Sequence, residues 1–324
     1  MPASASIYPT SEIQRDQWIR EQRPERRPVD PWRPYSFILE HECAANGEIV
    51  PVATIFLTNR ECPWRCLMCD LWRNTLLSDT PAGAIPAQID YALRHLPSTP
   101  RHIKLYNSGS FFDPRAIPIS DYPEIADRLT SFERVIVECH PALIGENCLR
   151  FRDMLHHRLE VAMGLETVHP DILPKLNKRM TLPQFVDAAA RLHGHGIDLR
   201  VFILVKPPFM RSEDVAHWTK RALDFAFDHR ATAVTLIPTR AGNGAMDRLR
   251  KSSEFSPPTM AMLEDAASYG ISLRRGRVFV DCWDLERLRA CAACFEKRAS
   301  RLEEMNLSQR VQPVIRCSDC GGSR

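Results

Sequence analysis

Residues 53–69 of this 324-residue chain read ATIFLTNRECPWRCLMC. The apolar and β-branched run Ala53–Asn59 predicts a strand, because such side chains suit a pleated, buried surface. Three cysteines, Cys62, Cys66 and Cys69, follow in the loop directly after this strand. In a β/α barrel, the loops at the carboxyl ends of the strands form the catalytic rim. The stretch therefore predicts three thiolates at the active-site face of a barrel.

Short apolar runs alternate with amphipathic stretches over residues 49–255, which is typical of βα units around a parallel sheet. The runs lack polar alternation, as expected for strands covered by helices on one face. The predicted strands are Val50–Leu57, His102–Tyr106, Val135–Cys139, Leu159–Met163, Leu199–Val205 and Thr232–Ile237. We predict a partial (β/α)6 TIM-like barrel, with an open α/β sheet as the alternative.

Two further regions flank the predicted barrel. Residues 1–48 are rich in Pro and Arg and lack periodicity, so we predict an extended N-terminal arm. Residues 256–324 carry a helical pattern, a short strand near Arg277–Asp281 and a cysteine-rich tail, which predicts a small metal-binding extension.

Composition narrows the class of protein. Lys and Arg total 43 against 40 Asp and Glu, and this net charge of +3 gives no general field for a polyanion. No apolar run approaches the roughly 18 residues of a membrane span, and the first residues lack the apolar core of a signal peptide. We therefore predict a cytoplasmic protein without a membrane segment.

The cysteine loop has the chemistry of a metal site. Soft thiolates select iron–sulfur clusters or zinc, and three of them can bind three irons of a cubane cluster while the fourth iron stays open. Two alternatives remain at this stage, namely a zinc ion whose ligand set His41 or Cys43 completes, and three reduced free thiols.

The three-then-two spacing of the cysteines, after a first strand and before further β/α units, resembles the radical S-adenosylmethionine (SAM) superfamily. The resemblance implies a 4Fe-4S cluster on Cys62, Cys66 and Cys69, with SAM on the open iron. It also implies reductive cleavage of SAM to a 5′-deoxyadenosyl radical that abstracts hydrogen from a substrate. An electron donor such as flavodoxin or ferredoxin would supply the electron. Met68 departs from the family pattern, which often has an aromatic residue there, but a thioether can still contact an adenine.

The ends of the later strands are then expected to bind SAM. Ser108, Gly109 and Ser110 stand where the family has a Gly-Gly-Glu-like segment, although the same residues also suit a plain turn. Glu138 and Glu166 close the next two strands and can accept hydrogen bonds from ribose or a substrate amine, or else form ion pairs at the rim. Tyr106, Glu138 and Lys206 are candidate catalytic residues that the sequence does not rank, and a solvated Lys206 is the alternative at that position.

Three further segments resemble the branch that contains the Elongator catalytic subunit and the radical-SAM subunit of archaeosine synthase. These segments are Tyr106–Asp113, Gly164–Glu166 with Leu176–Lys178, and Leu204–Pro208, and the similarity covers residues 49–247. Because pockets diverge on one fold, we predict only a small-molecule or modified-nucleoside substrate. The alternative class is a non-catalytic adaptor that binds zinc and RNA.

The tail contains two cysteine pairs, Cys291 with Cys294 and Cys317 with Cys320, separated by 22 residues. Pairs with this spacing predict a structural zinc site, and an auxiliary 4Fe-4S cluster is the open alternative because four thiolates suit either. Cys282 is a possible extra ligand or a core thiol, and we expect Cys43, Cys139 and Cys148 to be core or loop thiols. After Ile271 the tail has 11 basic against 7 acidic residues, which leaves RNA contact open.

Overall fold

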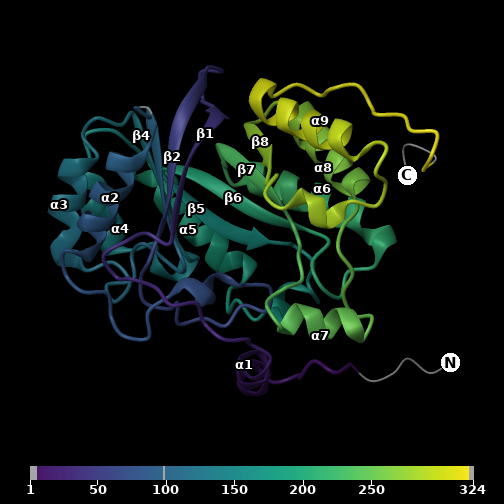
Figure 1. Cartoon of the computed structure of the whole chain (residues 1–324), viewed down its shortest axis with the longest axis horizontal. Helices are drawn as coiled ribbons and strands as arrows, with labels where there is room; N and C mark the ends of the chain where they lie inside the picture. Colours follow the sequence, from purple (N-terminus) through teal and green to yellow (C-terminus); the bar gives the residue numbers. More distant parts are fainter. Residues whose placement is uncertain (1–5, 98, 321–324) are drawn as a thin grey trace.

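A curled sheet with helices on its outer face forms the body of the protein (Figure 1). The structure is a computed structural model that describes residues 6–97 and 99–320. Within them, the sheet has eight strands in chain order. The strands are β1 (Ser36–Cys43), β2 (Ile49–Leu57), β3 (His102–Asn107), β4 (Arg134–Glu138), β5 (Arg158–Glu166), β6 (Asp198–Val205), β7 (Ala233–Pro238) and β8 (Arg277–Val280). Strands β2 to β8 are parallel, and β1 is antiparallel to β2.

Helices connect the parallel strands and cover their outer face. The helices are α1 (Glu12–Glu21), α2 (Ala84–His95), α3 (Tyr122–Arg128), α4 (Glu146–Met154), α5 (Leu182–Gly194), α6 (Val215–Asp228), α7 (Ala245–Lys251), α8 (Met260–Ser272) and α9 (Phe295–Ser308). Alternate strand residues such as Ile103, Leu105 and Val161 are fully buried in the main core, which also contains the apolar faces of the helices. This burial explains why the strands have no polar outer face.

The strand count differs from the prediction. All six predicted strands and the short strand of the extension are present, but β1 lies inside the segment predicted as an extended arm. That prediction is also wrong for residues 12–21, which form α1. A hairpin joins β1 to β2, with Ala44 N donating to Glu48 O (2.7 Å) and Gly47 at a φ of 87°.

Charged side chains fill the inside of the curl at the end where the parallel strands begin. Arg200 on β6 donates to Glu42 on β1 and to Glu160 on β5. Arg134 and Arg277 also reach Glu160, at 3.0 and 3.1 Å. Because buried charges need partners, this network ties strands from both edges of the sheet together.

Helix α9 satisfies the open edge of β8. The Asn306 side chain exchanges two 2.8 Å hydrogen bonds with the backbone of Val280, and the Gln309 side chain exchanges two of 2.7 and 3.0 Å with Val278. Both edge strands, β1 and β8, contact α9. Since unpaired edges invite association, these two amides take the place of a ninth strand. No helix in the described part of the chain is long and apolar enough to span a membrane.

Candidate active site

The cysteine loop leaves the carboxyl end of β2, as the sequence predicts. Leu67 N donates to Leu176 O at 2.9 Å, and Cys69 N donates to Cys66 O at 3.2 Å, which fixes the turn between the second and third cysteines. Burial raises the pKa of Cys62, Cys66 and Cys69 to about 12. As free thiols they would be neutral, and a bound metal centre would deprotonate them.

Trp64 of the cysteine loop stacks on the ring of His140, which follows β4. Their centroids lie 3.8 Å apart at an interplanar angle of 13°. The His140 Nδ1 accepts from the Ala142 N–H, so its Nε2 carries the proton that is donated to Lys178 O at 3.0 Å. Burial lowers the pKa of His140 to about 3, so this ring remains neutral at physiological pH.

An ion pair lies beside the thiols. The Lys178 ammonium contacts Glu166 Oε1 at 2.5 Å, and both side chains are buried. Gly164 makes room for the pair, because a Cβ there would lie 2.1 Å from either charged group. The Lys178 charge also lowers the pKa of Cys66 against the effect of burial. Glu166 was predicted as a site residue, but its partner Lys178 was not. The available signal was the Leu176–Lys178 segment, which carries part of the family resemblance.

The segment after β3 meets the cysteine loop directly. A Cβ on Gly109 would lie 3.2 Å from the Cys62 Cβ, so the two chains approach as closely as glycine allows. Ser110 Oγ accepts from His140 N (2.9 Å), which ties the end of β3 to the end of β4. The Ser108 Oγ is buried and has no hydrogen-bond partner within the described residues.

Aromatic rings and a carboxyl group line the inside of the curl. Tyr106 makes edge contacts with Phe56 and Phe202, with ring centroids 6.3 and 6.2 Å apart, and all three residues are half-buried. Glu138 ends the neighbouring strand β4. Burial raises the pKa of Glu138 to about 8, although the Asn107 backbone N–H and the Lys178 ammonium act in the opposite direction. Glu138 is therefore largely protonated at neutral pH.

Replacing Glu138 is expected to remove a pH dependence of stability. The unfolded glutamate ionises near pH 4.3, whereas the folded one keeps its proton to about pH 8. Unfolding therefore releases a proton in this window, and the free energy of unfolding falls as pH rises, by at most about 1.4 kcal/mol per pH unit. Urea unfolding of Glu138→Gln should lack this slope. The exposed Glu303→Gln serves as the control, and equal slopes in both variants would contradict the prediction.

Lys206 and Met68 complete the predicted set. The Lys206 ammonium donates to Ser256 Oγ (2.7 Å) and lies 3.4 Å from Pro257 O, so it is a bonded, buried lysine rather than a solvated one. Met68 is half-buried and packs against a small core that contains Leu67, Met246 and Leu249.

A zinc ion completed by His41 or Cys43 is contradicted. These residues pair with Pro51 and Ile49 at the start of β2, whereas Cys62 follows the end of β2. Cys139 and Cys148 lie in the main core, as predicted.

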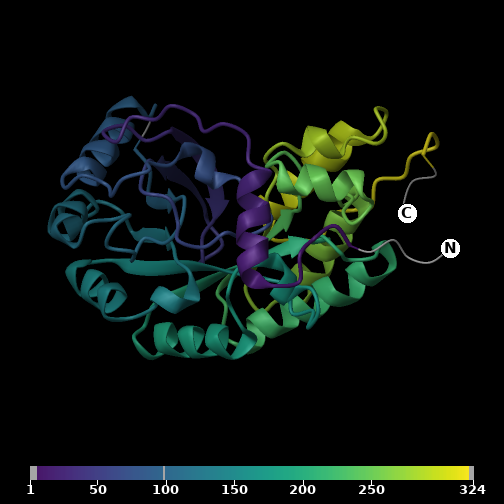
Figure 2. The ribbon, with the colours of Figure 1, turned by 90° about the horizontal axis from the view of Figure 1, so that it is seen from below.

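Helix α1 crosses the same face of the molecule. In Figure 2 it lies in front of the strands. Asp16 accepts from Asn177 Nδ2 (2.7 Å) and from Arg179 Nη2 (2.9 Å), and Ile19 shares the small core with Leu67. The amino-terminal segment therefore covers the cysteine loop.

The four tail cysteines meet at one point. Their sulfurs all lie within 4.8 Å of one another, with Cys291 Sγ 3.9 Å from Cys317 Sγ and Cys294 Sγ 3.7 Å from Cys320 Sγ. The backbone N–H groups of Cys320 and Asp319 lower the pKa of Cys317 to about 7. Cys282 lies outside this set, near Val280 O and Asn306. The tail thus forms a four-thiol site that could hold a metal.

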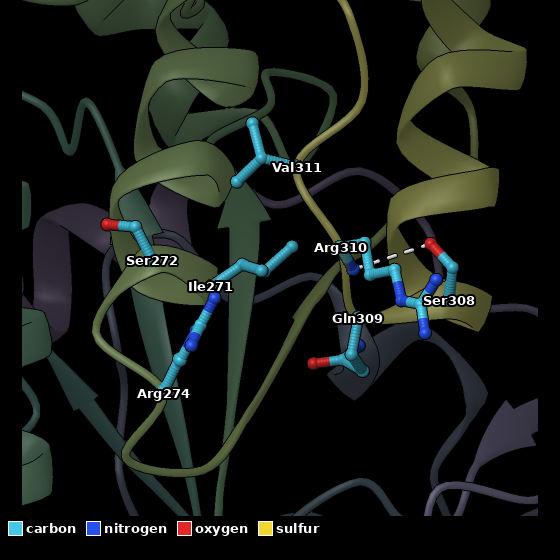
Figure 3. A pocket seen from close by; sticks show the side chains of 7 residues that line it. All are labelled: Ile271, Ser272, Arg274, Ser308, Gln309, Arg310 and Val311. Atoms are coloured by element: carbon cyan, nitrogen blue, oxygen red, sulfur yellow. Dashed lines mark hydrogen bonds between the residues drawn. The ribbon is translucent and has the colours of Figure 1, made fainter.

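A separate cavity of about 840 Å³ opens at the far end of the sheet (Figure 3). Residues from the carboxyl ends of α8 and α9 line it, among them Arg274 and Arg310. It lies near the start of β8, whereas the cysteine loop follows the end of β2.

Known proteins share the fold of this chain. The sequence matches no protein-family model. Among solved structures, methylornithine synthase superposes with a TM-score of 0.51 at 11% identity, covering 70% of this chain and 64% of that one. An N-terminally truncated Elp3 of Methanocaldococcus infernus gives 0.50 at 16% identity, covering 69% and 59%. At these identities the likeness establishes the fold alone.

Curated relatives point to the branch that the sequence indicated. The archaeosine synthase subunit beta of Methanosarcina acetivorans is 26% identical over 227 residues, 66% of this chain and 65% of that protein. An uncharacterised protein of Methanocaldococcus jannaschii is 23% identical over 256 residues, 74% of this chain and 70% of its own length. The resemblance to this branch of the radical SAM superfamily is thereby confirmed.

Proposed function

We propose that the protein is a radical SAM enzyme that holds a 4Fe-4S cluster on Cys62, Cys66 and Cys69. The observation that carries the proposal is the placing of three thiols on one short loop at the carboxyl end of β2. Their sulfurs do not form a close group as those of the tail do. Three ligands on three different irons stand farther apart than ligands of a single ion, and they leave the fourth iron open for a substrate.

The surrounding residues fit such a cluster with SAM. Bound there, the cluster and SAM would supply a 5′-deoxyadenosyl radical for hydrogen abstraction. Gly109 admits the β3 segment against Cys62, and the unpartnered Ser108 Oγ offers a buried polar group at the same place. Buried Lys178 would offset the negative charge of the thiolates. Trp64 and His140 would keep water from the loop.

A small molecule or a modified nucleoside is the substrate class that we propose. The half-buried rings of Phe56, Tyr106 and Phe202 suit a flat, partly apolar molecule, and protonated Glu138 can donate a hydrogen bond to it. The relative named archaeosine synthase subunit beta supports the nucleoside alternative.

We further propose that the tail holds one zinc ion rather than an auxiliary cluster. A tetrahedral ion with metal–sulfur bonds of about 2.3 Å places its ligand sulfurs about 3.8 Å apart. The two measured distances of 3.9 and 3.7 Å agree with this spacing. Sulfurs that bind four different irons of a cubane would stand farther apart.

Anaerobic reconstitution with iron and sulfide tests the main proposal. The protein should become brown, retain iron, and release 5′-deoxyadenosine from SAM under reducing conditions, as followed by mass spectrometry. The Cys69→Ala variant should lose iron and this product. The Cys282→Ala variant should retain both, because Cys282 lies outside both cysteine sets. A colourless protein with two zinc ions per chain would overturn the proposal and favour the adaptor. Product from Cys69→Ala would overturn the assignment of the cluster to these three cysteines.

A further inference from the structure

Two buried asparagines hold the backbone of the cysteine loop from outside. Asn177 Nδ2 donates to Arg65 O at 2.8 Å, and Asn243 Nδ2 donates to Leu67 O at 2.8 Å and to Cys69 O at 3.1 Å. Their exposed fractions are 1% and 4%. Three alternate carbonyls of the loop are therefore fixed by side chains that come from distant parts of the chain.

The direction of these carbonyls fixes the direction of the loop N–H groups. In a trans peptide the C=O and the following N–H point to opposite sides, and the described chain has no cis peptide. Carbonyls turned toward the asparagines thus turn the N–H groups of residues 66, 68 and 70 the other way. The Cys66 N–H acts to lower the pKa of the Cys66 thiol against the effect of burial, which agrees with this direction of the dipole.

We propose that Asn177 and Asn243 are positioning residues that raise the reduction potential of a cluster on the three cysteines, an inference that rests on the proposed function. N–H groups aimed at thiolates and sulfides stabilise the reduced form most, because it carries one more negative charge. The asparagines bind the loop peptides and would act on the potential through them.

Both asparagines bind the loop through their amide N–H groups, not through their side-chain oxygens. The Asn177 Oδ1 is buried without a hydrogen-bond partner within the described residues, whereas its Nδ2 makes two bonds. Asn243 Oδ1 accepts from Met246 N (2.8 Å) at the start of α7, so its amide also joins the loop to that helix.

A redox titration of the reconstituted full chain, read by the spin signal of the reduced cluster, tests the role. We expect Asn243→Ala and Asn177→Ala to retain iron but to lower the reduced-to-oxidised ratio about tenfold at a fixed potential. For a one-electron couple this corresponds to about 59 mV. Asn306→Ala is the matched control, because its amide binds β8 backbone in the same way but far from the loop. It should lose stability and keep the wild-type potential.

The outcomes separate this inference from the proposed function. If the wild type holds iron and cleaves SAM while both variants keep its potential, the positioning role is overturned and the enzyme assignment stands. If Asn243→Ala retains no iron, Asn243→Asp replaces it, since this variant keeps the acceptor for Met246 and lacks the amide donor. If both Asn243 variants lose iron while Asn306→Ala retains it, Asn243 has only a structural role and the positioning role is overturned. A wild type without iron would overturn both proposals.

Discussion

Arg200→Met is expected to lower the free energy of unfolding by about 3–5 kcal/mol, because it breaks the centre of the buried charge network. Arg200 is 2% exposed, and its guanidinium binds Glu160 Oε1 at 2.6 Å and Glu42 Oε1 at 2.5 Å. Without it, both carboxylates remain buried with fewer partners, and each unpaired charge destabilises the fold. Urea unfolding at neutral pH measures the change.

The matched control is Arg101→Met. Arg101 binds Glu133 (2.6 Å) and Glu48 (3.1 Å), but its side chain is 42% exposed, so solvent screens these pairs and we expect a much smaller loss. Equal losses in the two variants would contradict the prediction.

The free energy of unfolding of Arg200→Met should also fall less in acid than that of the wild type. Burial raises the pKa of Glu160, but the charges of Arg200, Arg277 and Arg134 outweigh this effect and lower it to about 2. In the wild type, the stability that ionised Glu160 contributes is therefore lost as pH falls from about 4.3 toward 2.

This charge network also explains where sequence-based prediction ended. Parallel strands with continuous apolar runs were predictable, because helices bury their outer faces. Strand β1 was not, because Glu40 and Glu42 lie on its inward face and make it resemble a solvated arm. Asn46-Gly47 was the available signal, since this dipeptide favours a tight hairpin between two strands.

At the candidate site, the sequence likewise predicted the cysteine loop but not the residues that contact it. The cysteine spacing and the preceding strand predicted the thiol loop, because the three cysteines lie within eight residues of one another. The residues that surround the cysteine loop come from distant parts of the chain. They include Lys178 after β5, Asn243 before α7 and Asp16 on α1. Such contacts follow from how the strand ends converge, and a single sequence carries no periodic signal for them.

In the tail, Cys294→Ala is expected to remove the metal and to loosen α9. Cys294 is the N-cap residue of α9 and is buried, while its partner Cys320 comes from the end of the described chain. Structural zinc contributes about 10–16 kcal/mol of apparent binding free energy in small zinc-binding peptides, so its loss outweighs a single side-chain contact. Metal analysis of the reconstituted protein should show one zinc fewer per chain, with the iron content unchanged.

The consequence for the fold follows from what α9 covers. Asn306 and Gln309 satisfy the edge of β8, so a loosened α9 would expose the backbone of Val278 and Val280. We expect faster hydrogen exchange at these two amides in Cys294→Ala, with little change in the central strands.

X-ray absorption of the wild-type protein at the zinc edge should give four sulfurs near 2.3 Å and no second metal. Iron lost together with the tail metal, or a metal–metal contact, would instead indicate an auxiliary cluster, because zinc on four thiolates has no metal neighbour.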